Sequence, residues 1–84
     1  MNKFPITTWN QLISLPVNTK IIEYSNTDVG SFKNINMRKW KTGDLLEKER
    51  AIKLHNENGG CVLLYESNFT TAIESKTAKV FYVK

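Results

Sequence analysis

Apolar residues fall at helical spacing close to the start of the chain. Trp9 and Leu12 lie on one face of a helix, and Thr8 with Gln11 three residues later forms a capping box, which is typical of a helix start. Pro16 cannot continue a helix, because it lacks a backbone N–H and its ring clashes with the preceding turn. The pattern predicts a short N-terminal helix.

Several later segments have the composition of strands. The segment 20–25 is rich in β-branched residues, and 32–41 follows it after the turn formers of 25–31, so we expect these two segments to form a hairpin. The apolar run 61–65 is expected to be a central, buried strand. The segment 79–83 is expected to be a further strand.

The segment 45–57 carries the clearest local helix signals in the chain. Asp44 and Glu47 are spaced as a second capping box, and Glu49 precedes Lys53 by four residues, the favourable orientation for an ion pair on a helix. Two glycines follow the segment and suit the left-handed residue that ends a helix. We therefore predict the main helix at about 45–57.

The segment 69–75 is ambiguous. Thr70 and Ile73 favour a strand, whereas Thr71 with Glu74 could cap a short helix. We predict a strand, which gives the order α-β-β-α-β-β-β.

The length and composition fit one small domain that spans 1–84. The apolar fraction is 40% and the charged fraction 24%, which is ordinary for a globular protein. The predicted fold is α+β: an antiparallel or mixed sheet of four to five strands, with the main helix on one face and a short N-terminal helix. Because so short a chain buries only about 60% of the surface of its unfolded form, stability is expected to be modest. A homo-oligomer would be one remedy.

The sequence also bears on location and origin. No apolar run approaches the roughly 18 residues of a membrane span, and the first six residues resemble no signal peptide. We expect a cytoplasmic protein without a membrane partner. The abundance of Asn, Lys and Ile is typical of AT-rich genomes, including those of many phages.

The positive charge is unevenly distributed. The net charge is +4, and the stretch 32–41 holds four of the twelve basic residues and no acid, so the other eight basic residues equal the eight acids in number. A second acid-free stretch is 75–84, whereas acids concentrate in 44–57. The basic residues of the two acid-free stretches are Lys33, Arg38, Lys39 and Lys41 in the first and Lys76, Lys79 and Lys84 in the second.

Side chains of an extended segment 32–41 alternate between two faces. Ile35 and Met37 form the natural core pair, and the opposite face would display Phe32, Asn34, Asn36, Arg38 and Trp40. Aromatic rings stack on bases, amides bind base edges and cations neutralise phosphates. The pattern therefore predicts binding of RNA or single-stranded DNA. The predicted nucleic-acid-binding residues are Lys33, Asn34, Asn36, Arg38, Lys39, Trp40, Lys41, Lys76 and Lys79.

A purely structural interpretation of the same stretch stays open. A bulge between Arg38 and Trp40 would turn the indole into the core and leave an ordinary solvated strand. The lysines could also pair with the acidic segment 44–57.

The sequence contains little that suggests catalysis. His55, the only histidine, is expected on the surface near a helix end, and Cys61 is expected to be a small core residue. These two residues and scattered carboxylates compose no metal site, and we expect no cofactor.

Three functions follow in order of preference. The first is a small basic, non-enzymatic protein that binds RNA or single-stranded nucleic acid. The second is a phage- or mobile-element-encoded inhibitor, resembling an antitoxin in its action, whose basic face docks on an acidic protein, alone or together with RNA. The third is a small metal-free ribonuclease that uses Lys, Arg and Tyr.

Overall fold

The computed structural model describes residues 2–26 and 35–84, which form six antiparallel strands and two helices. The strands form one open sheet in the order β1-β6-β2-β3-β4-β5. An α+β fold was predicted and is confirmed, with a larger sheet and less helix than expected. The strands are β1 (Lys3–Ile6), β2 (Lys20–Asn26), β3 (Ile35–Leu46), β4 (Ala51–Asn56), β5 (Cys61–Tyr65) and β6 (Ala78–Val83), and the helices are α1 (Trp9–Ile13) and α2 (Glu66–Glu74).

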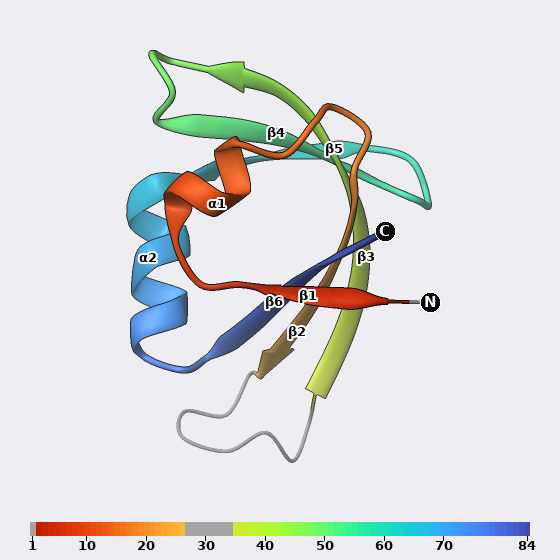
Figure 1. The fold of residues 1–84 in the computed structure, drawn as a ribbon, viewed down its shortest axis with the longest axis vertical. Coiled ribbons are helices and arrows are strands. Elements are labelled where there is room, and N and C mark those ends of the chain that lie inside the picture. Colours follow the sequence, from red (N-terminus) through yellow and green to blue (C-terminus); the bar gives the residue numbers. More distant parts are fainter. Residues whose placement is uncertain (1, 27–34) are drawn as a thin grey trace.

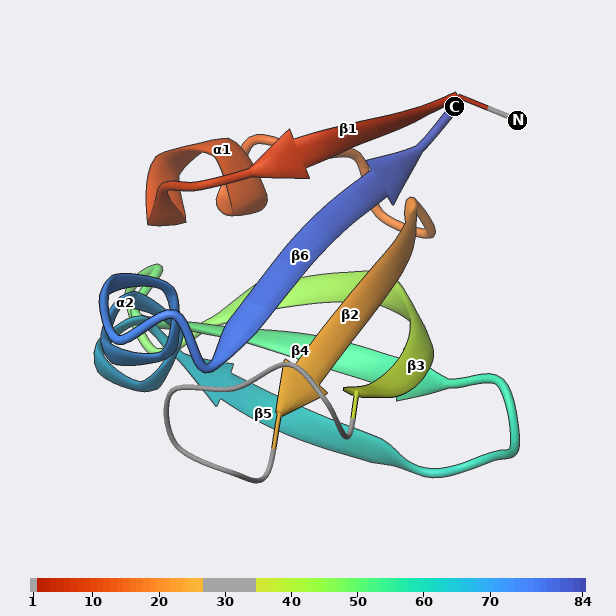
Figure 2. The same cartoon turned by 90° about the horizontal axis from the view of Figure 1, so that it is seen from below.

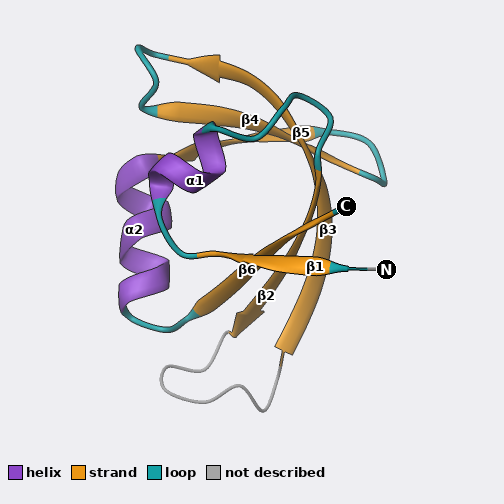
Figure 3. Ribbon diagram, in the orientation of Figure 1, coloured by secondary structure: helices purple, strands orange, loops and turns teal. Residues whose placement is uncertain are grey.

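The sheet is strongly curved, and both helices lie on its concave side (Figure 1). Figure 3 shows α1 and α2 together on one side of the ring of strands, and the two helices contact each other. We call the concave side of the sheet the inner face and the convex side the outer face. Neither helix of the described part of the chain is long and apolar enough to cross a membrane.

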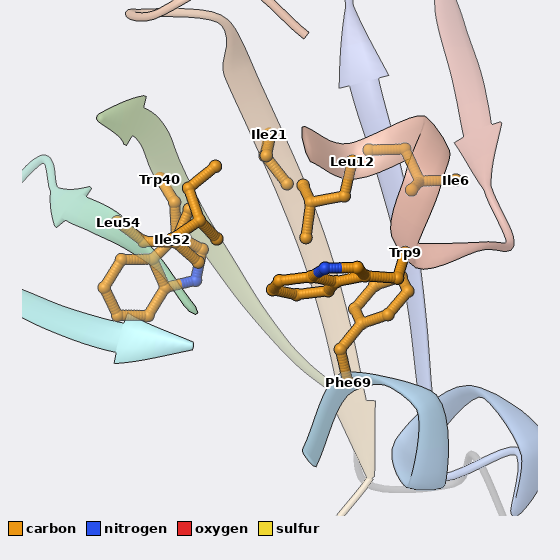
Figure 4. Close-up of a cluster of buried hydrophobic side chains, with 8 residues drawn as sticks. All are labelled: Ile6, Trp9, Leu12, Ile21, Trp40, Ile52, Leu54 and Phe69. Carbon is orange, nitrogen blue, oxygen red and sulfur yellow. The ribbon is translucent and has the colours of Figure 1, made fainter. Parts of the chain in front are cut away.

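The core fills the space between the inner face and the helices (Figure 4). Trp9 of α1 packs against Phe69 of α2, with 5.8 Å between the ring centroids. The buried apolar residues of this cluster are Ile6, Trp9, Leu12, Ile21, Trp40, Ile52, Leu54 and Phe69.

The short helix α1 confirms the prediction for the start of the chain. The Thr8 hydroxyl accepts a hydrogen bond from the Gln11 backbone N–H at 3.2 Å, and the Gln11 side chain accepts one from the Thr8 N–H at 3.2 Å. This capping box satisfies two N–H groups that a helix start leaves unpaired. The helix ends at Ile13, before Pro16.

The main helix predicted at about 45–57 is wrong. The chain there is the end of β3, a turn and β4. Glu47, Lys48 and Glu49 have φ values of 52°, 56° and 69°, a left-handed conformation that no right-handed helix contains. The indole N–H of Trp9 donates to the carbonyl of Glu49 at 3.1 Å and holds this turn against α1. β4 pairs with β3 along one edge and with β5 along the other, and it buries Ile52 and Leu54 in the core. These interactions override the local helix signals.

Two further predictions need correction. The strand predicted at 69–75 is instead helix α2, which places Phe69 in the core. The segment 61–65 is a strand, as predicted, but it lies at the edge of the sheet and not in the centre. Val62 and Leu63 are 46% and 42% exposed. The predicted strand 79–83 is confirmed as β6, which lies between β1 and β2.

The predicted hairpin of 20–25 with 32–41 is found as antiparallel pairing of β2 with β3. The residues 27–34, which include most of its predicted turn, lie outside the described part. β3 continues five residues past the predicted end, through an irregularity between Thr42 and Leu45 where its pairing with β4 shifts register. A bulge of this kind bends a strand, so β3 can turn from β2 to β4 around the core.

Thr42 fixes the position of this bend. Its side chain is fully buried, and its hydroxyl donates to the Pro16 carbonyl at 2.7 Å and accepts from the Thr19 N–H at 2.9 Å. Its backbone N–H donates to the Thr19 carbonyl at 3.0 Å, and its carbonyl accepts from the Asn18 N–H at 2.7 Å. Four hydrogen bonds thus join β3 to the loop between α1 and β2.

Replacement of Thr42 by valine tests this role. Thr42→Val keeps the shape but removes the hydroxyl and its two hydrogen bonds, to the Pro16 carbonyl and from the Thr19 N–H, so we expect the free energy of unfolding to fall by about 1–3 kcal/mol. Urea denaturation measures the change. Thr71→Val, at an exposed position on α2, is the matched control and should change stability by much less. Equal effects of the two substitutions would contradict the role of Thr42.

Candidate nucleic-acid interface

Strand register shows which side chains reach the outer face. Ile21 and Trp40 are opposite each other and belong to the core, so their neighbours Ile22 and Lys39, also opposite each other, point outward. The same alternation in β6 turns Phe81 outward, because the adjacent Val80 and Tyr82 pack against the core.

Six lysines from five neighbouring strands occupy outer-face positions. We call them the outer lysines: Lys3 of β1, Lys79 of β6, Lys20 of β2, Lys39 and Lys41 of β3, and Lys53 of β4. Apart from Asp44 in the irregular stretch of β3, no acid occupies an outer-face strand position among the described residues. The outer face is therefore electropositive.

Lys20 and Lys41 are directly opposite each other on β2 and β3, and both are exposed. Like charges in this position repel and destabilise a sheet. Both lysines line a groove of about 250 Å³ whose other lining residues include the apolar Ile22 and Val83. Glu57, in the turn after β4, also lines the groove and is its only acid. The groove is thus lined by apolar side chains and by three lysines.

Two aromatic side chains lie on the same face. Tyr24 of β2 and Phe81 of β6 meet edge to face, with 5.9 Å between ring centroids and an interplanar angle of 84°. The Nζ of Lys3 lies 5.2 Å from the Tyr24 centroid and 4.9 Å from that of Phe81. An ammonium at this distance is attracted to the ring faces. Both rings are half-buried and keep part of their surface accessible.

The structure brings only some of the predicted site residues together. Lys39 and Lys41 are exposed on the outer face of β3, and Lys79 is exposed on the same face of β6, with β2 between them. Lys76 lies at the turn after α2 and lines, with Lys79 and Phe81, a second groove of about 440 Å³. Asn36 is described only as a backbone position of β3, and Lys33 and Asn34 lie outside the described residues.

Trp40 does not belong to the exposed surface. Its side chain is 7% exposed, and its indole N–H has no hydrogen-bond partner among residues 2–26 and 35–84. Of the two arrangements considered for Trp40, the buried one is found, without a bulge between Arg38 and Trp40, because β3 keeps a continuous register with β2 there. Arg38 shares the parity of Trp40 and is exposed opposite Glu23, so it does not lie beside Lys39 on the outer face.

The faces of β3 are therefore the reverse of the prediction around Trp40. Met37, predicted in the core, is 53% exposed on the outer face. The acidic segment 44–57 forms strands and turns in place of a helix, and its Glu57 lines a groove together with Lys20, Lys39 and Lys41.

Sequence reasoning missed most of the outer face. Tyr24 and Phe81 were assigned to strands but not to a surface, and three outer lysines were not predicted as site residues: Lys3, Lys20 and Lys53. The alternation of Lys20, Ile22 and Tyr24 is the signal that would have placed Lys20 and Tyr24 on one face.

The residues considered for catalysis also change position. Cys61 is exposed, so the prediction of a core residue is wrong. It is opposite His55 in the β4–β5 register. The imidazole leans the other way, toward β3: a Cβ on Gly43 would lie 2.9 Å from its Nε2. Among the described residues, no three His, Cys, Asp or Glu side chains gather so that they could hold a metal ion.

A separate polar hollow lies where β5 leads into α2. It has a volume of about 680 Å³ and is lined by Glu47, Arg50, Tyr65 and residues of α2. The Tyr65 hydroxyl donates to the Glu47 carboxylate at 3.3 Å. The negative charge of Glu47 raises the pKa of Tyr65 above its ordinary value.

The chain matches no protein-family model, no curated protein and no solved structure. The geometry of the outer face is therefore what supports a function.

Removal of one charge from the Lys20–Lys41 pair should stabilise the free protein. We expect Lys41→Gln to raise the free energy of unfolding by about 0.2–1 kcal/mol, because it relieves repulsion across the strands. Urea denaturation at low and high salt measures this, and the gain should shrink at high salt. Lys48→Gln, in the exposed β3–β4 turn, controls for the lower net charge. An equal gain in Lys48→Gln would show that the pair itself has no effect.

Proposed function

We propose that this protein binds RNA or single-stranded DNA on the outer face of its sheet and acts without catalysis. The observation that carries the proposal is the presence of outer lysines and two accessible aromatic rings on one face. The lysines provide affinity for phosphates, and the rings of Tyr24 and Phe81 provide surfaces on which unpaired bases stack.

The arrangement favours single strands over duplex. Neither helix carries a basic residue, so no helix is suited to enter a major groove. Bases in a duplex are already stacked and cannot lie on Tyr24 or Phe81. A base that stacks there displaces the Lys3 ammonium from the rings, and the freed ammonium can pair with the adjacent phosphate.

The Lys20–Lys41 pair also supports an anionic partner. Two ammonium groups face each other at some loss of stability, and a phosphate between them would convert repulsion into attraction. The apolar lining of the groove, which includes Ile22 and Val83, can accept the face of a sugar or base.

An acidic protein is the alternative partner for the same face. The 53% exposure of Met37 beside Lys39 favours it, because exposed methionine is enriched in protein interfaces. In that case the protein acts as an inhibitor and oligonucleotides bind weakly or not at all.

Charge reversal on the outer face tests the phosphate contacts. We expect Lys39→Glu with Lys41→Glu to weaken binding of labelled oligo-U or oligo-dT by at least about tenfold at low salt, and to reduce the slope of log affinity against log salt by about 1.4 for two lost contacts. Fluorescence anisotropy at several salt concentrations measures both. Lys48→Glu with Arg50→Glu has the same charge change in the β3–β4 turn and should bind nearly as wild type. If both double variants lose equal affinity, only net charge matters and the outer-face site is refuted.

Loss of the rings tests stacking separately. Tyr24→Leu and Phe81→Leu keep apolar surface but remove the aromatic planes, so we expect a loss of about 1–3 kcal/mol in binding energy, roughly 5- to 150-fold in affinity, for each stacked base. The salt slope should stay unchanged, because no cation is removed. Unaltered affinity in both variants would mean that bases do not stack on this face. The length of the oligonucleotide after the experiment, read on a denaturing gel, reports the ribonuclease alternative.

A further inference from the structure

The two edges of the sheet differ in chemistry. Figure 2 shows the edge strands β1 and β5 at opposite ends of the sheet. β1 contains Lys3 and Pro5, and both residue types discourage pairing at an edge, one by its charge and one by its missing N–H. β5 has five residues, Cys61–Tyr65, and none is charged or proline. Only β5 lacks these means of blocking an added strand.

The hydrogen bonds at the ends of β5 show which of its backbone groups point outward. The Asn56 N–H donates to the Gly60 carbonyl at 3.0 Å, and the Glu66 N–H donates to the Arg50 carbonyl at 2.8 Å. Antiparallel ladders alternate, so Val62 and Leu64 bond to β4, whereas Cys61, Leu63 and Tyr65 direct their N–H groups away from it. No strand of the described residues pairs with β5 on that side.

Several side chains of β5 are exposed to solvent, as is the backbone along its unpaired edge. Cys61 is exposed, and Val62 and Leu63 are 46% and 42% exposed on opposite faces of the strand. An apolar, uncharged edge with outward N–H and C=O groups is a template for another strand.

We propose that β5 pairs antiparallel with β5 of a second copy of this chain, about a two-fold axis through Leu63. In this register Leu63 is opposite Leu63 of the partner subunit. Cys61 is opposite Tyr65 of the partner subunit. The residues that exchange hydrogen bonds are then the ones whose groups point away from β4. Both copies use the same strand in this contact, so the two-fold axis gives a closed dimer.

The symmetry of the outward groups favours a second copy as the occupant, because Cys61, Leu63 and Tyr65 are spaced evenly about Leu63 and the edge is complementary to itself. Two copies each carry a net charge of +4 and repel through their basic surfaces. β5 carries no charge, so pairing along this edge brings no like charges of β5 together. The glycine turn before β5 leaves room beside the partner: a Cβ on Gly59 or Gly60 would meet nothing within 4 Å. A two-fold axis through a shared ladder keeps both outer faces on one side of the joined sheet.

Substitution at the axis tests the dimer in solution. Wild-type protein should show a concentration-dependent monomer–dimer equilibrium in sedimentation velocity. Leu63→Glu places two carboxylates against each other on the axis and should abolish the dimer. The fold should tolerate the change, since Lys53 is opposite Leu63 within the chain. Val17→Glu, at a loop residue that is 56% exposed, makes a comparable change and should leave the dimer intact.

Cysteine cross-linking tests the register. In a Cys61→Ser background, Leu63→Cys places two thiols opposite each other with about 5.5 Å between Cα atoms, within the range of disulfides, and mild oxidation should yield covalent dimers. Val62→Cys in the same background points to the other face, opposite Leu64 of the partner subunit, and should cross-link far less. A wild-type protein that stays monomeric at all concentrations, a dimer that persists in Leu63→Glu, or equal cross-linking of the two cysteine variants would each overturn the proposal.

Discussion

The buried hydroxyl of Thr42 is the point on which the shape of the sheet depends. β3 pairs with β2 up to Lys41 and with β4 from Trp40 onward, and Thr42 is the last residue before the pairing with β4 shifts register. The bonds from Thr42 to Pro16 and Thr19 anchor the loop from α1 at the position where the strand begins to bend. The bend lets one sheet surround a core that two short helices complete. A fully buried polar group with all partners present can fix one arrangement in a way that apolar packing alone does not.

The curvature also separates the two faces by role. The inner face holds the large buried side chains, including those of both tryptophans, whereas no described helix or strand forms a second layer over the outer face. Side chains such as Tyr24 and Phe81 are therefore half-buried only by their neighbours in the sheet. A surface that carries repelling lysines and accessible rings contributes little to stability, and the binding function that we propose would account for its composition.

Local interactions were the predictable part of this fold. The capping box of Thr8 and Gln11 involves groups three residues apart, so the sequence is sufficient to identify it. The segment 45–57 shows the opposite case. Asp44 and Glu47 have the spacing of a helix start, but Ile52 and Leu54 alternate into the core between two neighbouring strands, and that burial outweighs helix propensities of a few tenths of a kcal/mol per residue. The prediction of the candidate site was wrong in part for the same reason. Which side chains of β3 point into the core depends on which residue is opposite Ile21 in the ladder. The residue types of Trp40 and Met37 do not show this by themselves.

The place of β6 has a consequence for how the molecule reaches its folded state. β6 lies between β1 and β2, so β1 acquires its only neighbour in the sheet from a segment more than seventy residues further along the chain. Closing so long a loop costs chain entropy before any favourable contact offsets that cost, so such pairings form slowly. Until β6 arrives, β2 has a bare edge, while β2 to β5 can already assemble as consecutive hairpins. Docking of β6 should therefore be a late step, and the intermediate before it should be the species most exposed to aggregation.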